Sequence, residues 1–218
     1  LNEFQNVYGA GLNGQFEYRY FTAPDSIVND QGDYIYFETG DSIPEFNTGY
    51  YGKSWGPAMH GQSYIDWDGV LRNFEPQENN YNDFYQTGMN IQNSFSIDKS
   101  DEQSHIRFSY SNMKSNSISP NSSFQRDNIS LRAGSKLSSK IQIDAKVAYS
   151  RQYALNRLNQ SDGRGAARHF NLMPRSITLA SLENYSDVSG NELIWYTPWP
   201  WMSNPYWMAY ENKNEDQK

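Results

Sequence analysis

Apolar and polar residues alternate along the middle of the chain. In the first half of this region the alternation flanks the polar residues 98–103, and its apolar members are Met89, Ile91, Phe95, Ile97, Ile106, Phe108 and Tyr110. In the second half it flanks residues 135–140, with apolar members Ile129, Leu131, Ala133, Ile141, Ile143, Ala145, Val147 and Tyr149. A period of two on both sides of a polar turn predicts a β-hairpin, so this region predicts two hairpins.

The connections around the predicted strands differ in length. Each hairpin turn takes about six residues, whereas the link at residues 112–126 is longer. Two stretches of roughly sixty residues, 23–86 and 153–210, lie on either side. Strands of compact soluble domains are usually joined by a few residues, whereas outer-membrane barrels alternate short turns with long outer loops. The spacing therefore favours transmembrane strands in the region of about residues 87–152.

The composition narrows the class of protein. Hydrophobic residues make up 37% of the 218 residues, and the 6 Trp, 17 Tyr and 11 Phe exclude wholesale disorder. The net charge of −7 leaves no basic footprint for nucleic acid. The absence of cysteine excludes disulfides, thiolate metal sites and a Cys nucleophile. No run of about 18 apolar residues predicts a membrane-spanning helix, whereas half-apolar barrel strands leave no such signal.

Three motifs that resemble functional sites have simpler interpretations. Residues 9–14 match G-x-G-x-x-G, but the alternating residues 15–21 predict a strand where a dinucleotide site needs a helix. Residues 66–69, Asp-Trp-Asp-Gly, lack the full set of calcium ligands and favour a turn. The three histidines are far apart and fit no metal or catalytic motif: His60, His105 and His169. We therefore expect no metal, no cofactor and no catalytic residue.

Aromatic residues are concentrated in the Gly-, Pro- and Asn-rich stretches. Such rings can pack in a loop core, stack on sugars, contact a partner or lie in a membrane's aromatic belt. The candidates for substrate or partner contact are Trp55, Trp67, Trp195, Trp199 and Trp201. A short helix is also expected near residues 166–172, with Pro174 stopping it.

Several segments in order resemble the SusC/RagA family of TonB-dependent outer-membrane transporters. They are LNEFQNVYGAGLNG, SWGPAMHGQSY, NDFYQTGMNIQNSFSI, HIRFSYSN and SPNSSFQRDNISLRAGSKLSSKIQIDAKVAYS. Residues 204–207 and 210–212 also resemble the family's loop before its next strand. Each segment alone is short, but together they extend over nearly the whole chain.

The resemblance implies an all-β fold, as part of a large antiparallel transmembrane barrel. Members belong to the plugged class of roughly 22 strands. They import oligosaccharides or peptides across Bacteroidota-type Gram-negative outer membranes, driven through TonB, with a SusD-like surface lipoprotein as a lid. The chain resembles the early barrel wall and two long extracellular loops, 23–86 and 153–210, without the plug or the C-terminal barrel.

On this interpretation the two faces of the strands have different surroundings. The residues expected to face lipid are Ile91, Phe95, Ile97, Ile106, Phe108, Ile129, Leu131, Ile141, Ile143 and Val147. Those expected to face the barrel lumen are Arg107, Arg132, Asp144 and Lys146. Two alternatives remain open. One is a soluble carbohydrate-binding β-sandwich, and the other is a glycan-active enzyme that uses Asp66 or Asp68.

Overall fold

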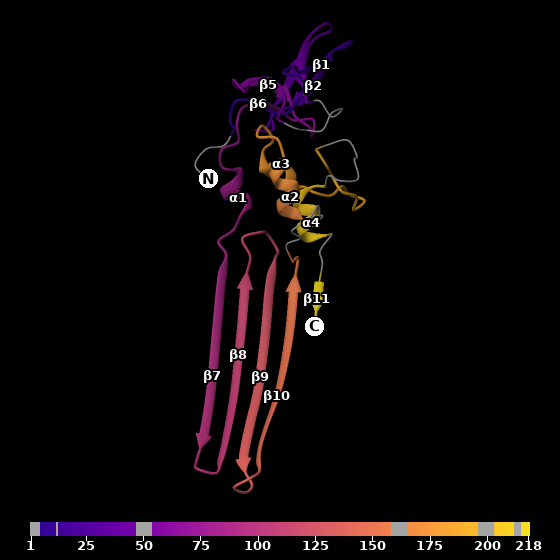
Figure 1. Ribbon diagram of the computed structural model, residues 1–218. Coiled ribbons are helices and arrows are strands. Elements are labelled where there is room, and N and C mark those ends of the chain that lie inside the picture. The colour runs from indigo at the N-terminus through magenta and orange to yellow at the C-terminus, as the bar shows by residue number, and fades with distance from the viewer. Residues whose placement is uncertain (1–4, 12, 47–53, 158–164, 196–202, 212–214) are drawn as a thin grey trace. The chain divides into compact units, whose positions relative to one another are not determined.

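The computed structural model describes residues 5–11, 13–46, 54–157, 165–195, 203–211 and 215–218. The described chain is mostly β-strand with a few short helices, as an all-β assignment requires. It divides into two units (Figure 1). We call Leu1–Tyr85 with Ser161–Glu211 the loop unit, and Gln86–Gln160 with Asn212–Lys218 the sheet unit.

The sheet unit is one antiparallel sheet of long strands that run side by side in Figure 1. The strand order is β11-β10-β9-β8-β7. The strands are β7 (Met89–Ser100), β8 (Ser104–Asn116), β9 (Ser123–Lys136), β10 (Gln142–Leu155) and the short β11 (Glu215–Gln217). Strands β7 and β8 form one hairpin and β9 and β10 the other, which confirms both predicted hairpins.

The strands extend further than the apolar alternation indicated. The link between the hairpins is residues 117–122, shorter than the predicted 112–126, and the first turn is 101–103. Asn112 pairs with Asp127 in the ladder between β8 and β9. Backbone pairing therefore continues where both faces of the strands carry polar side chains, and hydrophobic periodicity cannot report a strand of that kind.

The loop unit is built from the two stretches that the sequence indicated as long loops. One sheet has the order β1-β4-β5-β6, and β2 and β3 form a separate hairpin. Its strands are β1 (Glu17–Tyr20), β2 (Asp25–Val28), β3 (Tyr34–Phe37), β4 (Ser42–Glu45), β5 (Gln62–Ile65) and β6 (Leu71–Phe74). Its helices are α1 (Asn80–Phe84), α2 (Ala166–Asn171), α3 (Leu179–Glu183) and α4 (Pro205–Tyr210). The short helix expected before Pro174 is α2.

Aromatic side chains hold these two stretches together. The rings of Phe84 and Phe170 stack with centroids 4.1 Å apart, although 86 positions separate them in the chain. Leu182 and Trp195 belong to the same buried cluster. A second, smaller cluster contains Phe21, Ile27, Ile43 and Ile65. The aromatic residues therefore supply a hydrophobic core to segments that are otherwise rich in polar and turn-forming residues.

Asn204 is a buried polar residue that joins three parts of this core. Its side-chain amide donates to the carbonyl oxygens of Leu182 at 3.0 Å and Leu193 at 3.1 Å. Its Oδ1 accepts from the backbone N–H of Tyr206 at 2.9 Å and so caps α4. A buried amide with these partners is satisfied, so Asn204 fixes the start of α4 against the helix α3 region.

The glycines of residues 9–14 serve close packing and turns. Gly11 has a φ of +141°, which L side chains rarely adopt, and a Cβ on it would lie 2.7 Å from the Cα of Gly56. Strand β1 follows this segment, and no helix begins there. The structure thus supports the turn interpretation over a dinucleotide site.

Candidate functional site

One face of the sheet unit is apolar and exposed. The strand register aligns its side chains in rows across the sheet. One row is Phe95, Tyr110, Ile129 and Tyr149, and the next is Ile97, Phe108, Leu131 and Val147. Exposure in these two rows runs from 36% at Phe108 to 70% at Val147. Within the sheet unit, no other described element covers this face. Nine of the ten residues expected to face lipid lie in the strands on this face, and the tenth, Ile141, directly precedes β10.

The apolar rows form a band of limited height. Tyr149 and Ile141 lie eight residues apart, which is about 27 Å along an antiparallel strand. Beyond Tyr149 the next row is polar and consists of Asn93, Asn112, Asp127 and Arg151. The Phe95–Tyr149 row therefore forms an aromatic border between the apolar band and polar side chains.

The opposite face of the sheet is polar, and its side chains bond across the strands. The hydroxyls of Ser109 and Ser130 lie 2.8 Å apart. Asn128 donates to the hydroxyl of Ser111 at 3.1 Å and accepts from that of Ser150 at 2.8 Å. All four residues expected to face a lumen, Arg107, Arg132, Asp144 and Lys146, lie on this face.

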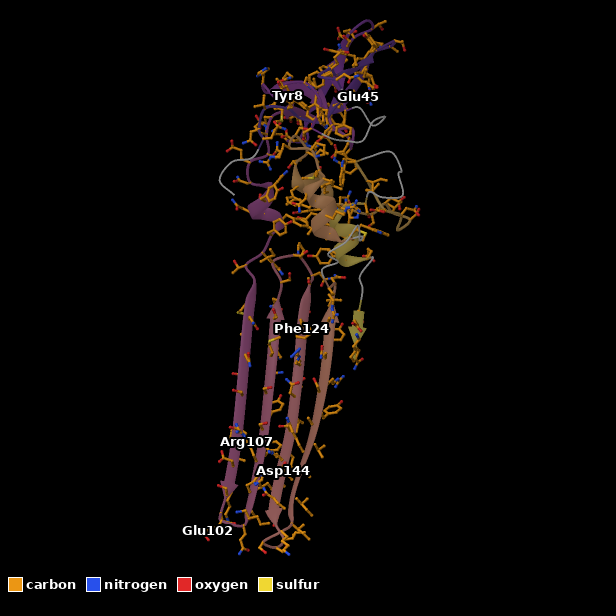
Figure 2. All side chains as sticks on the ribbon, in the orientation of Figure 1. Tyr8, Glu45, Glu102, Arg107, Phe124 and Asp144 are labelled. Atoms are coloured by element: carbon orange, nitrogen blue, oxygen red, sulfur yellow. The ribbon has the colours of Figure 1, made fainter. Side chains whose placement is uncertain are left out.

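A charged cluster lies on the polar face near the short turns, where Figure 2 labels Arg107 and Asp144. The Asp144 carboxylate accepts from Nε and Nη2 of Arg132, each at 3.0 Å, and lies 3.1 Å from Nε2 of His105. The imidazole crosses above Gly134, where a Cβ would lie 2.2 Å from its Cε1. Gly134 thus leaves the space through which His105 reaches Asp144.

We expect Gly134→Ala to displace the His105 ring and to destabilise the sheet by about 1 kcal/mol, because the added methyl group overpacks this contact. A double-mutant cycle with His105→Ala measures the effect from denaturation midpoints. The methyl group should cost little once the imidazole is absent. Equal costs in both backgrounds would contradict the assigned contact.

A polar groove of about 930 Å³ lies within the loop unit, a size typical of ligand sites. Strand β6, the turn before it, the β2–β3 turn and the α3 region line the groove. The turn is the Asp66–Gly69 segment, in which the Gly69 N–H donates to the Asp66 carbonyl at 2.9 Å. Gly69 has a φ of +80°, which confirms the predicted turn.

An acidic pair and one arginine organise this turn. Arg72 donates through both terminal nitrogens to the Asp68 carboxylate and through Nη1 to Asp66 at 3.0 Å. Asp66 is buried, and burial raises its pKa to about 6, although the Arg72 charge and the Trp67 N–H act against the rise. Both carboxylates bond to Arg72, so the three side chains form one ion-pair cluster.

This buried carboxyl predicts a pH dependence of stability. Unfolded Asp66 binds its proton near its ordinary pKa of 3.8, whereas folded Asp66 binds it near 6. Between these two pH values the folded state therefore binds more protons than the unfolded state. The free energy of unfolding consequently falls as pH rises from about 4 to about 6. We expect Asp66→Asn to remove this component of the urea midpoint, measured at several pH values. The exposed control Asp30→Asn should retain the slope, and an unchanged slope in Asp66→Asn would contradict the assignment.

The five candidate tryptophans have different positions. Trp67 is half-buried in the groove lining, and its indole N–H donates to the Ser181 hydroxyl at 2.9 Å. Trp55 is 69% exposed and lies outside this groove. Trp195 is 1% exposed and belongs to the buried core cluster of the loop unit. Trp199 and Trp201 lie outside the described residues.

The sequence did not indicate the other groove residues. Arg72, Asn73, Ser181 and Asn184 come from two segments about a hundred positions apart. No motif joins these segments, and tertiary contacts bring them together through the shared aromatic core and hydrogen bonds such as that of Asn80 to the Ile177 carbonyl. The pairing of Trp67 with Ser181 shows the same long-range origin.

The described ranges contain no group of three or more His, Asp or Glu side chains that is arranged to hold a metal ion. His169 is buried, accepts from the Ser203 N–H at 3.1 Å, and has a pKa lowered to about 4 by burial. Among the same residues, no helix combines the length and apolar content needed to cross a membrane.

Comparison with models of known protein families finds no match. Comparison with curated proteins likewise finds none.

Proposed function

We propose that this chain forms part of the wall and outer loops of a TonB-dependent outer-membrane nutrient importer of the SusC/RagA type. The observation that carries the proposal is the exposed apolar face of β7–β10. Its side chains align in rows, and the band they form ends at an aromatic row. Exposing such an array of apolar side chains to water is unfavourable. Contact with lipid or with another apolar surface removes that cost.

The opposite face supports a water-filled barrel interior. Hydroxyl, amide and charged side chains alternate with the apolar ones along every long strand, as in barrel walls. Strand β7 lies at one edge of the sheet, and β11 covers only the Tyr153–Leu155 end of β10. In a membrane these edges must be paired, so we infer further strands on both sides. A closed barrel of roughly 22 strands satisfies this requirement.

The proposed partners follow from this assignment. The loop unit is extracellular and contacts a SusD-like lipoprotein lid, while the TonB complex acts through the plug of the importer. The cargo is an oligosaccharide or a peptide. We propose no bond-making chemistry for this chain, since Asp66 and Asp68 are both held by Arg72.

The carbohydrate-binding β-sandwich has weaker support. A sandwich buries the apolar face of one sheet beneath a second sheet about 10 Å away. Among the described residues of the sheet unit there is no second sheet to pack on the apolar face of β7–β10, and Val147 and Tyr149 are largely exposed.

Cell fractionation tests the proposal directly. An antibody to residues 184–218 should label intact cells, and the antigen should remain with the outer-membrane fraction until detergent extracts it. Its mass should be far above 25.2 kDa. A soluble antigen of about this mass would overturn the importer and favour the soluble module.

A further inference from the structure

The groove of the loop unit carries polar side chains that have no hydrogen-bond partner among the described residues. Asn73, Glu75 and Asn184 line it, and their side chains make no hydrogen bond with the other described residues. Thr178, at the start of α3, also lines it with a free hydroxyl. These groups together offer amide donors, carbonyl and carboxylate acceptors and a hydroxyl to a bound molecule.

The charge of the groove disfavours anionic ligands. Arg72 is the basic residue in its described lining, and Asp66 and Asp68 already neutralise it. Asp30 and Glu75 add negative charge. A ligand carboxylate or phosphate would therefore meet repulsion with no free cation to offset it.

An aromatic wall complements the polar groups. Trp67 lines the groove, and its bond to Ser181 fixes the indole in place. A fixed indole offers a flat apolar surface at low entropic cost, which suits the C–H face of a sugar ring. Sugar hydroxyls, in turn, need a dense set of amide and carboxylate partners such as Asn73, Asn184 and Glu75.

A peptide fits this groove less well. Extended peptides commonly bind by adding a strand to a free sheet edge. The outer edge of β6 lies at the groove, but the β2–β3 turn already bridges to it through Asn29 and Leu71. A peptide carboxyl terminus would also find no free basic side chain in the described lining.

We propose that this groove binds a neutral oligosaccharide, with Trp67 stacking on a sugar ring and Asn73, Glu75 and Asn184 bonding its hydroxyls. This inference rests on the proposed function, because the importer assignment is what makes the sugar an external nutrient. The cargo that the importer assignment left as glycan or peptide is then a glycan.

Isothermal titration of the detergent-purified full protein tests this binding. The probes are hexasaccharides of glucose, mannose, xylose and fructose, galacturonic acid oligomers, and a mixture of short peptides, each at millimolar concentration. We expect at least one neutral sugar to bind. Trp67→Ala should weaken it by about tenfold, the scale of one aromatic contact. Asn184→Ala, at an exposed position whose side chain makes no hydrogen bond with the described residues, should weaken it severalfold, while Trp55→Ala should leave it unchanged.

Three outcomes would overturn the inference: no neutral sugar binds, peptides alone bind, or Trp67→Ala and Asn184→Ala bind as tightly as the parent. The fractionation experiment is read separately. If the protein is retained in the outer membrane but binds no neutral sugar, the glycan site is wrong and the importer proposal stands. If the protein is soluble and binds a neutral sugar, the importer proposal is wrong and the glycan site stands.

Discussion

Val147→Lys should destabilise the membrane-inserted protein by about 2–4 kcal/mol, the cost of a lysine near the bilayer midplane of a barrel wall. Val147 lies in the central apolar row with Phe108 and Leu131. It is 70% exposed in the sheet unit, so no protein core accounts for a loss at this position. In water the same substitution should change stability by less than about 0.5 kcal/mol, as at most surface positions.

The neighbouring residue supplies the control. Ala148 lies on the polar face, in the row of Ser109 and Ser130. Ala148→Lys places the same charge one position along the same strand, where a lumen would hydrate it. Denaturant titration of the full protein refolded in lipid vesicles measures both variants. Equal losses at positions 147 and 148, or no loss at either, would contradict a lipid-facing band.

The long strands could be predicted from the sequence because one physical rule governs them. Alternation of apolar and polar residues assigns both hairpins, and it assigns the sheet face of the strand residues that were expected to face lipid or a lumen. The rule loses its signal at Asn112 and Asp127, where polar side chains occupy both faces although the backbone pairing continues. The predicted link was too long for this reason.

The loop unit could not be predicted in the same way. Its order depends on contacts between distant segments, such as Phe84 with Phe170 and Trp67 with Ser181. Local composition at Trp195 and Trp55 is similar, yet one is buried and the other exposed. Turn chemistry did give the Asp66–Gly69 turn, since it depends on local backbone geometry alone. Which aromatic residues line a groove depends on the tertiary contacts.

Phe84→Ala should be the most damaging substitution in the loop unit, with a cost of about 3–5 kcal/mol for a buried phenylalanine. Phe84 is 2% exposed, stacks on Phe170 and meets the edge of Tyr85 and Tyr206. These contacts join α1 to α2 and α4. Loss of the Phe84 ring should therefore separate the first segment of the loop unit from the second. Protease resistance of the loop unit in the membrane-bound protein measures its local stability.

A matched control variant and a sugar-binding measurement show whether the effect of Phe84→Ala is structural. Tyr36→Ala removes an aromatic ring that is 78% exposed in the same unit, and it should leave protease resistance within about 0.5 kcal/mol of the parent. Phe84→Ala should also weaken sugar binding, because the groove needs β6 and α3 held together, yet Phe84 itself does not line the groove. Restored binding at low temperature, where the unit refolds, would identify the loss as structural. Unchanged protease resistance in Phe84→Ala would mean that the two outer segments are not joined through this core.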